Sequence, residues 1–162
     1  AIDEALAGFE PMAMRWQRRE VGGVLVINDA YNANPLSMEA ALRTFSELST
    51  NGAKWLVLGE MRELGEAGPA LHADLGRRVA EGRWAGLVAV GALAAAMADA
   101  AGAAGFPADR MARVPDAAAA ASVLRRWVRR GDAVLIKASR GLALEQVAEA
   151  LAASGPFPEA RS

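Results

Sequence analysis

The sequence has no cysteine and one histidine, and these shortages exclude several kinds of site. Without cysteine there are no disulfides and no thiolate metal ligands, which suits a reducing cytosol. The 18 Lys and Arg nearly balance the 19 Asp and Glu, so no basic excess indicates nucleic-acid binding. No apolar run approaches the roughly 18 residues of a membrane span, and the first ten residues carry acids where a secretory signal carries bases. We therefore expect a soluble, cytoplasmic protein with neither nucleic acid nor membrane as a partner.

Hydrophobic residues are abundant, at 53% of the 162 positions, which is enough for one domain with a substantial core. Short apolar runs alternate along the chain with stretches of helical periodicity. The Gly22-Gly23 pair between two such runs is typical of a β-hairpin. The expected strands are residues 14–21, 24–28, 54–58, 86–90, 109–114 and 133–137, and the expected helices are about 35–49, 68–82, 92–104, 116–130 and 142–153.

Strands that are apolar throughout and separated by helices indicate a sheet that is covered on both faces. Such sheets have parallel strands joined by right-handed crossovers. The sequence therefore predicts an α/β fold: a Rossmann-like, doubly wound, mostly parallel sheet of about six strands, with an antiparallel edge strand at residues 14–21.

The segment NDAYNANP, residues 28–35, follows the first expected parallel strand and is unusually polar. It holds three of the chain's four asparagines, its only tyrosine and an aspartate. In doubly wound sheets, ligands bind beyond the carboxyl ends of the strands. Amides and a carboxylate there can hydrogen-bond a ribose, an adenine edge or a peptide carboxylate, and Pro35 presets a helix whose amino end attracts anions. The alternative is a polar turn in which Asn34 caps the helix.

The segment GEMRELG, residues 59–65, follows the strand expected at 54–58. Its first glycine lets the backbone turn sharply or approach a ligand closely. Glu60 and Glu63 come next, either as functional groups or as solvated loop charges.

The segment KASRG, residues 137–141, follows the last expected strand. It places a lysine, a serine and an arginine at the mouth of the sheet. Cations in that position suit a phosphate or a carboxylate. The alternative is a basic loop that merely precedes a helix.

Taken together, the three segments resemble the motifs of the Mur ligases, which are ATP-dependent peptide-bond-forming enzymes. NDAYNANP, LGEMRELG and IKASRGLALE match patterns of the third domain of that family, most closely in the branch that uses D-alanyl-D-alanine. The resemblance spans roughly residues 11–152. It departs from the family at Ala138, where glycine is usual, and residues 11–15 follow the interdomain pattern P-x-x-G-R only loosely.

This resemblance implies the C-terminal domain of a ligase of peptidoglycan precursor synthesis. The whole enzyme would phosphorylate the carboxylate of UDP-N-acetylmuramoyl-tripeptide with ATP and Mg²⁺, and the amine of D-alanyl-D-alanine would attack the acyl phosphate. The chain has no GxxxxGK[ST] phosphate loop, so that loop, the metal ligands and the catalytic residues are expected in a central domain. Residues 1–13 are then the end of that domain and a hinge, 14–153 the C-terminal domain, and 154–162 a frayed tail.

The resemblance also assigns roles to residues of this chain. Asp29 is expected to bind the ATP ribose, with Tyr31, Asn32, Asn34 and Arg15 shaping or completing the nucleotide site. Lys137, Ser139, Arg140 and Glu60 are expected to seat the dipeptide or to act in domain closure. An alternative is that Arg140 holds its loop against Glu60 or Glu63.

Other classes of α/β protein share part of this pattern. Another Mur-type ligase, or a folylpolyglutamate synthase-like enzyme, shares the fold and the first aspartate but carries different residues after it. A receiver-like signalling module needs a phosphoacceptor aspartate after its third strand, where this chain has Gly91. A stand-alone dinucleotide-binding enzyme needs a glycine fingerprint after its first strand, and NDAYNANP is not one.

The remaining expectations concern packing. His72 is expected at the surface or in helix packing, and Trp55, Trp84 and Trp127 in the core or at its margin. Trp16, on the edge hairpin, is available to touch a missing domain. No heptad seam runs along the chain, so a monomer is expected.

Overall fold

The alternation of strands and helices predicted from the sequence is present in the structure, a computed structural model that describes residues 16–162. The hinge expected within residues 1–13, and Arg15, lie outside the described residues. The strands are β1 (Gln17–Val21), β2 (Val24–Asn28), β3 (Lys54–Gly59), β4 (Gly86–Val90), β5 (Met111–Val114) and β6 (Ala133–Lys137). The helices are α2 (Pro35–Glu47), α3 (Gly68–Glu81), α4 (Ala94–Ala103), α5 (Ala117–Trp127) and α6 (Glu145–Ala153), with short 3-10 turns at Gly65–Ala67, Ala108–Arg110 and Arg140–Leu142.

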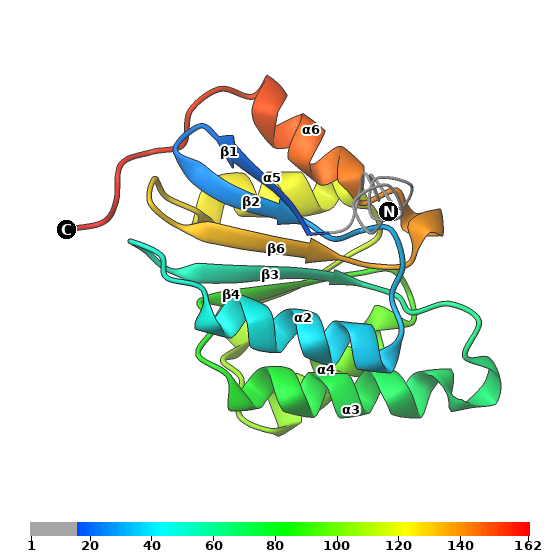
Figure 1. Cartoon of the computed structure of the whole chain (residues 1–162). Coiled ribbons are helices and arrows are strands. Elements are labelled where there is room, and N and C mark those ends of the chain that lie inside the picture. Colours follow the sequence, from blue (N-terminus) through cyan, green and yellow to red (C-terminus); the bar gives the residue numbers. More distant parts are fainter. Residues whose placement is uncertain (1–15) are drawn as a thin grey trace, which may run out of the picture.

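All six strands form one sheet in the order β1-β2-β6-β3-β4-β5 (Figure 1). β1 pairs antiparallel with β2, and every other neighbouring pair is parallel. The predicted fold class, with five parallel strands and one antiparallel edge, is therefore confirmed. The last strand, β6, lies between β2 and β3, so the segments that follow these three strands are neighbours.

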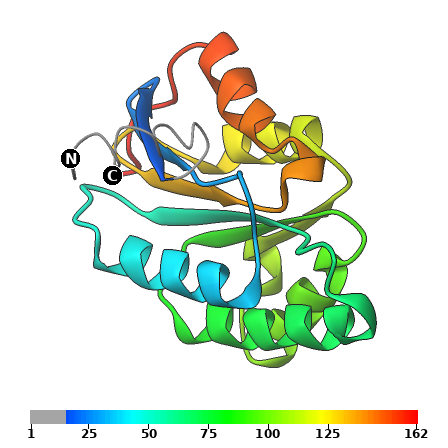
Figure 2. The ribbon, with the colours of Figure 1, turned by 45° about the vertical axis from the view of Figure 1, so that its right-hand side comes forward.

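Helices cover both faces of the sheet, with α2, α3 and α4 on one face and α5 and α6 on the other (Figures 1 and 2). The side chains of each strand alternate between two separate cores. In β3, for example, Val57 packs toward α5 and α6, whereas Leu56 and Leu58 pack toward α2 and α3. Because the parallel strands β2, β4 and β6 are buried on both faces, they appear in the sequence as nearly continuous apolar runs, whereas β5 at the sheet edge is only partly buried.

The boundaries of some elements differ from those expected. The strand expected at 109–114 begins at Met111, because a 3-10 turn precedes it. The helix expected from residue 142 begins at Glu145, because Ala143 adopts a left-handed conformation with φ of 52°. A residue in the left-handed conformation interrupts an α-helix, and the sequence Ala-Leu-Glu contains no residue type that favours that conformation.

Within the segment expected to be a frayed tail, residues 155–158 contact the rest of the domain. The Phe157 side chain is buried, and its backbone N–H donates to the Gly22 carbonyl in the β1–β2 turn at 3.0 Å. The Arg125 guanidinium lies 4.2 Å from the centroid of the Phe157 ring and donates to carbonyls of the tail. Burial of an aromatic ring and a cation–π contact together hold this segment.

Trp55, Trp84 and Trp127 occupy the positions predicted for them, in the core or at its margin. Trp84 is buried and stacks on Phe45, with ring centroids 5.6 Å apart, and Trp55 stacks on Trp127 at the margin of the opposite core. His72 is fully buried in α3, which rules out a surface position and leaves helix packing.

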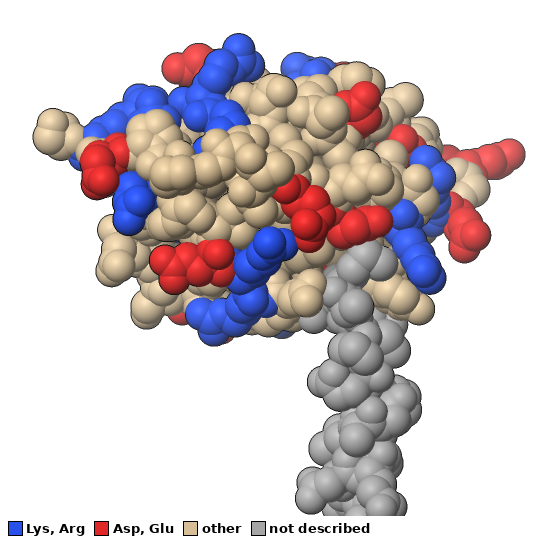
Figure 3. All heavy atoms as spheres, turned by 90° about the horizontal axis from the view of Figure 1, so that it is seen from above, with Lys and Arg blue, Asp and Glu red and all other residues tan. Residues whose placement is uncertain are grey.

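Charged side chains of both signs are spread over the face of the molecule seen in Figure 3, in keeping with the near balance of charge. In the described part of the chain, no helix is both long enough and apolar enough to cross a membrane.

Candidate functional site

The strand order brings the predicted motifs together. β2, β6 and β3 are neighbours, and all three run in the same direction. Their carboxyl ends therefore lie at one edge of the sheet, and the segments after them contain Asp29, Ser139 and Glu60 respectively. This is the point where the strand order reverses, which is where doubly wound sheets bind ligands.

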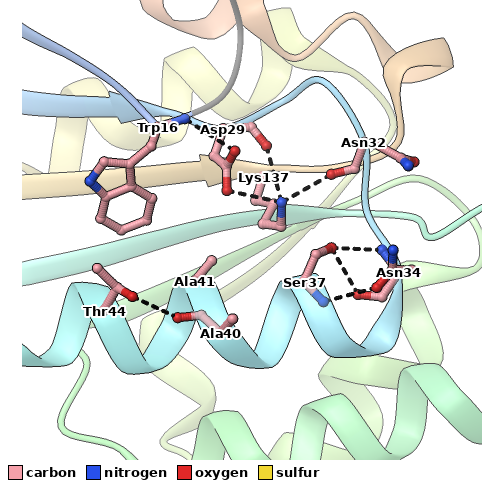
Figure 4. A pocket seen from close by; sticks show the side chains of 9 residues that line it. All are labelled: Trp16, Asp29, Asn32, Asn34, Ser37, Ala40, Ala41, Thr44 and Lys137. Carbon is pink, nitrogen blue, oxygen red and sulfur yellow. Dashed lines mark hydrogen bonds and ion pairs between the residues drawn. The ribbon is translucent and has the colours of Figure 1, made fainter. Parts of the chain in front are cut away.

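A cavity of about 480 Å³ opens at this edge, between the end of β2 and helix α2, whose lining residues extend to Thr44 (Figure 4). Trp16, Asp29 and Lys137 form one wall of it, and α2 forms the other. The lining residues are Trp16, Asp29, Asn32, Asn34, Ser37, Ala40, Ala41, Thr44 and Lys137.

Asp29 and Lys137 form an ion pair at the cavity wall. The Lys137 ammonium lies 2.9 Å from Asp29 Oδ2, and the two side chains are 4% and 14% exposed. The ammonium also donates to the Asn32 carbonyl at 3.0 Å, while Asp29 Oδ1 accepts from the Trp16 backbone N–H at 3.1 Å. Both oxygens of the carboxylate are therefore held in place, and a charged group of this kind needs such partners when it is removed from water.

The opposite wall begins with a capped helix terminus. Asn34 is the N-cap of α2: its Oδ1 accepts from the Ser37 N–H at 2.9 Å, and Ser37 Oγ accepts from the Asn34 N–H at 3.0 Å. The structural alternative for Asn34, a helix cap, is thus confirmed, and the same residue lines the cavity. Pro35 occupies the first turn, as predicted.

Next to the cavity, the segment after β3 is tied to the segment after β6. The Ser139 N–H donates to the Glu60 carbonyl at 3.0 Å, and Ser139 Oγ accepts from the Arg62 N–H at 2.8 Å. Ser139 is buried, and Met61, between the two bonded residues, is fully buried in the core. The two loops therefore form one hydrogen-bonded unit at the mouth of the sheet.

Arg140 leaves this unit toward the β2 side. Its guanidinium lies 5.6 Å from the centroid of the Tyr31 ring, a cation–π geometry that links the first and last motifs. The ion pairs of the described residues do not include one between Arg140 and either Glu60 or Glu63. The alternative in which Arg140 anchors its loop to those glutamates therefore has no support in the structure.

The structure does not bring the predicted site residues together in the two sets that were expected. Lys137 was expected beside Ser139 and Arg140, but its ammonium contacts Asp29 and Asn32 in the cavity. Trp16, Ser37 and Thr44 also line the cavity and were not predicted. Ser37 and Thr44 lie on one face of α2, and this helical spacing is the only sequence signal that would have pointed to them.

In the described part of the chain, no three His, Cys, Asp or Glu side chains are grouped so that they would hold a metal ion.

Comparison with known proteins places this geometry in a family. A family model described as Mur ligase, glutamate ligase domain matches residues 14–140. The UDP-N-acetylmuramoyl-tripeptide–D-alanyl-D-alanine ligase of Bacillus subtilis is 33% identical over 155 residues, covering 93% of this chain and 34% of the relative. The enzyme of the same name from Mycobacterium tuberculosis is 40% identical over 148 residues, covering 81% of this chain and 29% of the relative.

Solved structures agree. A MurF ligase from Thermotoga maritima in complex with ADP has a TM-score of 0.72 and 29% identity, covering 91% of this chain and 32% of that one. A MurF structure from Acinetobacter baumannii has a TM-score of 0.75 and 30% identity, covering 86% of this chain and 30% of that one. The chain thus spans about a third of the length of the relatives it matches. Because the family model matches most of the chain, this protein belongs to the Mur ligase family, in its glutamate ligase domain.

Proposed function

We propose that the chain is the C-terminal domain of an ATP-dependent ligase that adds D-alanyl-D-alanine to UDP-N-acetylmuramoyl-tripeptide, and that its Asp29 cavity binds the nucleoside part of ATP. The observation that carries the proposal is the Asp29 carboxylate, held at the carboxyl end of β2 with both oxygens bonded. The names of the relatives, and the ADP complex of one of them, support the choice of enzyme and ligand.

The chemistry of the cavity fits a nucleoside. A carboxylate has about four lone-pair positions, so Asp29 can still accept from ribose hydroxyls after binding Lys137 and the Trp16 N–H. The indole of Trp16 and the methyl groups of Ala40 and Ala41 add apolar surface to the lining. A volume of about 480 Å³ is within the usual range of roughly 300–1,000 Å³ for small-molecule sites.

In this proposal the neighbouring residues divide the remaining work. Lys137 holds the Asp29 carboxylate, and Asn32 and Asn34 complete the cavity wall. Ser139 and Arg140 face the dipeptide, whose free carboxylate suits an arginine and a hydroxyl. Tyr31 holds the Arg140 guanidinium through its ring, and Glu60 fixes Ser139 through its carbonyl.

The rest of the reaction belongs to parts of the enzyme outside this chain. We expect the phosphate loop and the Mg²⁺ ligands in a central domain, together with Arg15 at the hinge. Closure of this domain over the nucleotide would exclude water from the acyl phosphate, which otherwise hydrolyses. We also expect the protein to be cytoplasmic and the chain to be monomeric, which light scattering over a range of concentrations would check.

The test is a comparison of Asp29→Ala and Arg140→Ala in the complete enzyme. Asp29→Ala should raise the KM for ATP at least several-fold and leave the KM for D-alanyl-D-alanine nearly unchanged, whereas Arg140→Ala should do the reverse. Asp99→Ala is the matched control, because Asp99 is an exposed aspartate on α4 that pairs with Arg113. An unchanged KM for ATP in Asp29→Ala would remove Asp29 from the nucleotide site.

The chain alone should fold but not catalyse, because it contains no phosphate loop. Mixing the purified chain with ATP, the tripeptide nucleotide and D-alanyl-D-alanine should therefore give no product. Product formation would contradict the division of labour between the domains.

A further inference from the structure

His72, the only histidine, is enclosed in the protein and has both ring nitrogens bonded. It lies in α3, and its exposed fraction is 0%. Nε2 lies 2.9 Å from the backbone nitrogen of Met61, and Nδ1 lies 2.7 Å from the backbone oxygen of Gly68. A buried polar side chain with two well-placed partners has a defined structural task.

The two partners determine the protonation of the ring. The Met61 N–H can only donate, so Nε2 must be the unprotonated acceptor. The Gly68 carbonyl can only accept, so Nδ1 must carry the proton. His72 is therefore a neutral imidazole in one tautomer, oriented by its own helix and directed at the segment after β3.

Three successive residues of that segment, 60 to 62, are hydrogen-bonded either to His72 or to Ser139. The Glu60 carbonyl accepts from Ser139 N–H, the Met61 N–H donates to His72, and the Arg62 N–H donates to Ser139 Oγ. His72 thus holds the middle residue of the three, and Ser139 holds the two beside it. If Met61 moved away from the imidazole, Glu60 and Arg62 would move with it, and their hydrogen bonds to Ser139 would be disturbed.

We propose that His72 is a positioning residue that keeps residues 60–62 in place and thereby aims the Ser139 hydroxyl at the ligand. Ser139 Oγ accepts from the Arg62 N–H, so its own proton is directed away from Arg62 and is free to donate to an acceptor such as a carboxylate. The part of this inference that concerns the dipeptide rests on the proposed function. The part that concerns the loop does not.

Two variants separate the bonds of the ring. In His72→Gln, the longer amide reaches the position of Nε2, so its oxygen can still accept from the Met61 N–H. In His72→Asn, the shorter amide reaches the position of Nδ1 and can bond only the Gly68 carbonyl. Asn removes the contact with the loop, and Gln preserves it.

The first measurement uses the chain itself and needs no substrate. In His72→Asn, the amides of Met61 and Arg62 should exchange their hydrogens faster by about tenfold or more. The reason is that loss of one hydrogen bond raises the local opening equilibrium by nearly tenfold. His72→Gln should exchange at close to the unsubstituted rate. In the unsubstituted chain, nitrogen NMR should show a protonated Nδ1 and a coupling across the Met61–Nε2 bond, a result that does not depend on whether a variant folds.

The second measurement uses the complete enzyme. His72→Asn should raise the KM for D-alanyl-D-alanine several-fold with little change in the KM for ATP, and His72→Gln should restore it. In a Ser139→Ala background, His72→Asn should have no further effect on that KM.

Unchanged exchange at Met61 in His72→Asn, or an Nδ1 that carries no proton, would overturn the inference about the loop. Faster exchange combined with an equal rise in both KM values would overturn the link to Ser139 and leave His72 with a purely structural role. An enzyme that does not use D-alanyl-D-alanine at all would refute the proposed function while leaving the exchange result as the test of the loop.

Discussion

Lys137→Met should destabilise the chain, because it removes one partner of a buried ion pair. The Lys137 side chain is 4% exposed, and its ammonium bonds the Asp29 carboxylate and the Asn32 carbonyl. Methionine retains most of the apolar stem but supplies no charge. Asp29 then remains as an uncompensated carboxylate at the cavity wall.

The magnitude follows from how deeply the pair is buried. Removing one partner of a fully buried pair costs about 3–5 kcal/mol. Asp29 keeps its bond to the Trp16 N–H, its side chain is 14% exposed, and it borders a cavity that water can enter, so the cost here should be lower. We expect a loss of about 2–3 kcal/mol in the free energy of unfolding. At about 2–4 °C per kcal/mol, Tm should fall by roughly 4–12 °C.

Urea denaturation of the chain measures this loss, and the only other lysine is the matched control. Lys54 is half-buried and its ammonium bonds a single carbonyl, that of Ser46, so Lys54→Met should cost less than about 1 kcal/mol. The double variant Asp29→Asn, Lys137→Met removes both charges and should recover part of the loss, since replacing a whole buried pair is often nearly neutral. If Lys137→Met unfolds at the same urea concentration as the unsubstituted chain, the ion pair does not hold Asp29.

The same assay checks three further expectations. Asp132→Ala removes a buried carboxylate that accepts from an indole and from two backbone amides, and it should cost about 3–5 kcal/mol. Its control, Asp109→Ala at an exposed position, should cost almost nothing. Phe157→Ala should cost about 2–4 kcal/mol and expose the tail to proteolysis, whereas a frayed tail would give no change in either. Gly59→Ala should cost about 1–3 kcal/mol, because the new Cβ would lie 2.5 Å from the Cβ of Ala138. Adding Ala138→Gly should recover part of this loss. If the effects of the two substitutions are simply additive, the two side chains do not clash.

The fold could be predicted from the sequence because its main determinants are local. Apolar runs of five or six residues, Gly22-Gly23 and the Pro35 helix start each depend on residues that are neighbours in the chain. The positions of the strands at 24–28, 86–90 and 133–137 were confirmed for this reason. The boundary at Glu145 was not predictable, since it depends on a left-handed residue whose type does not favour that conformation.

The candidate site was only half predictable, because its grouping depends on strand order. Asp29 and Lys137 are 108 positions apart, and they meet because β6 lies beside β2. Periodicity identifies each strand but not its neighbours, so the sequence placed Lys137 at the correct edge of the sheet but could not show that its ammonium pairs with Asp29. His72 was likewise expected in helix packing or at the surface, and its bond to Met61 depends on a contact between α3 and the loop after β3.

The alanine at position 138, where the sequence departs from the motif that it resembles, fits between β3 and β6 without strain. Ala138 has no positive φ, so its side chain causes no strain in the backbone. Its Cβ is fully buried and occupies the space that Gly59, on the adjacent strand, leaves open by having no side chain. The next residue, Ser139, still donates to the Glu60 carbonyl and accepts from the Arg62 N–H. Ala138 is therefore accommodated between β3 and β6, directly before the Ser139 bonds that tie this loop to the segment after β3.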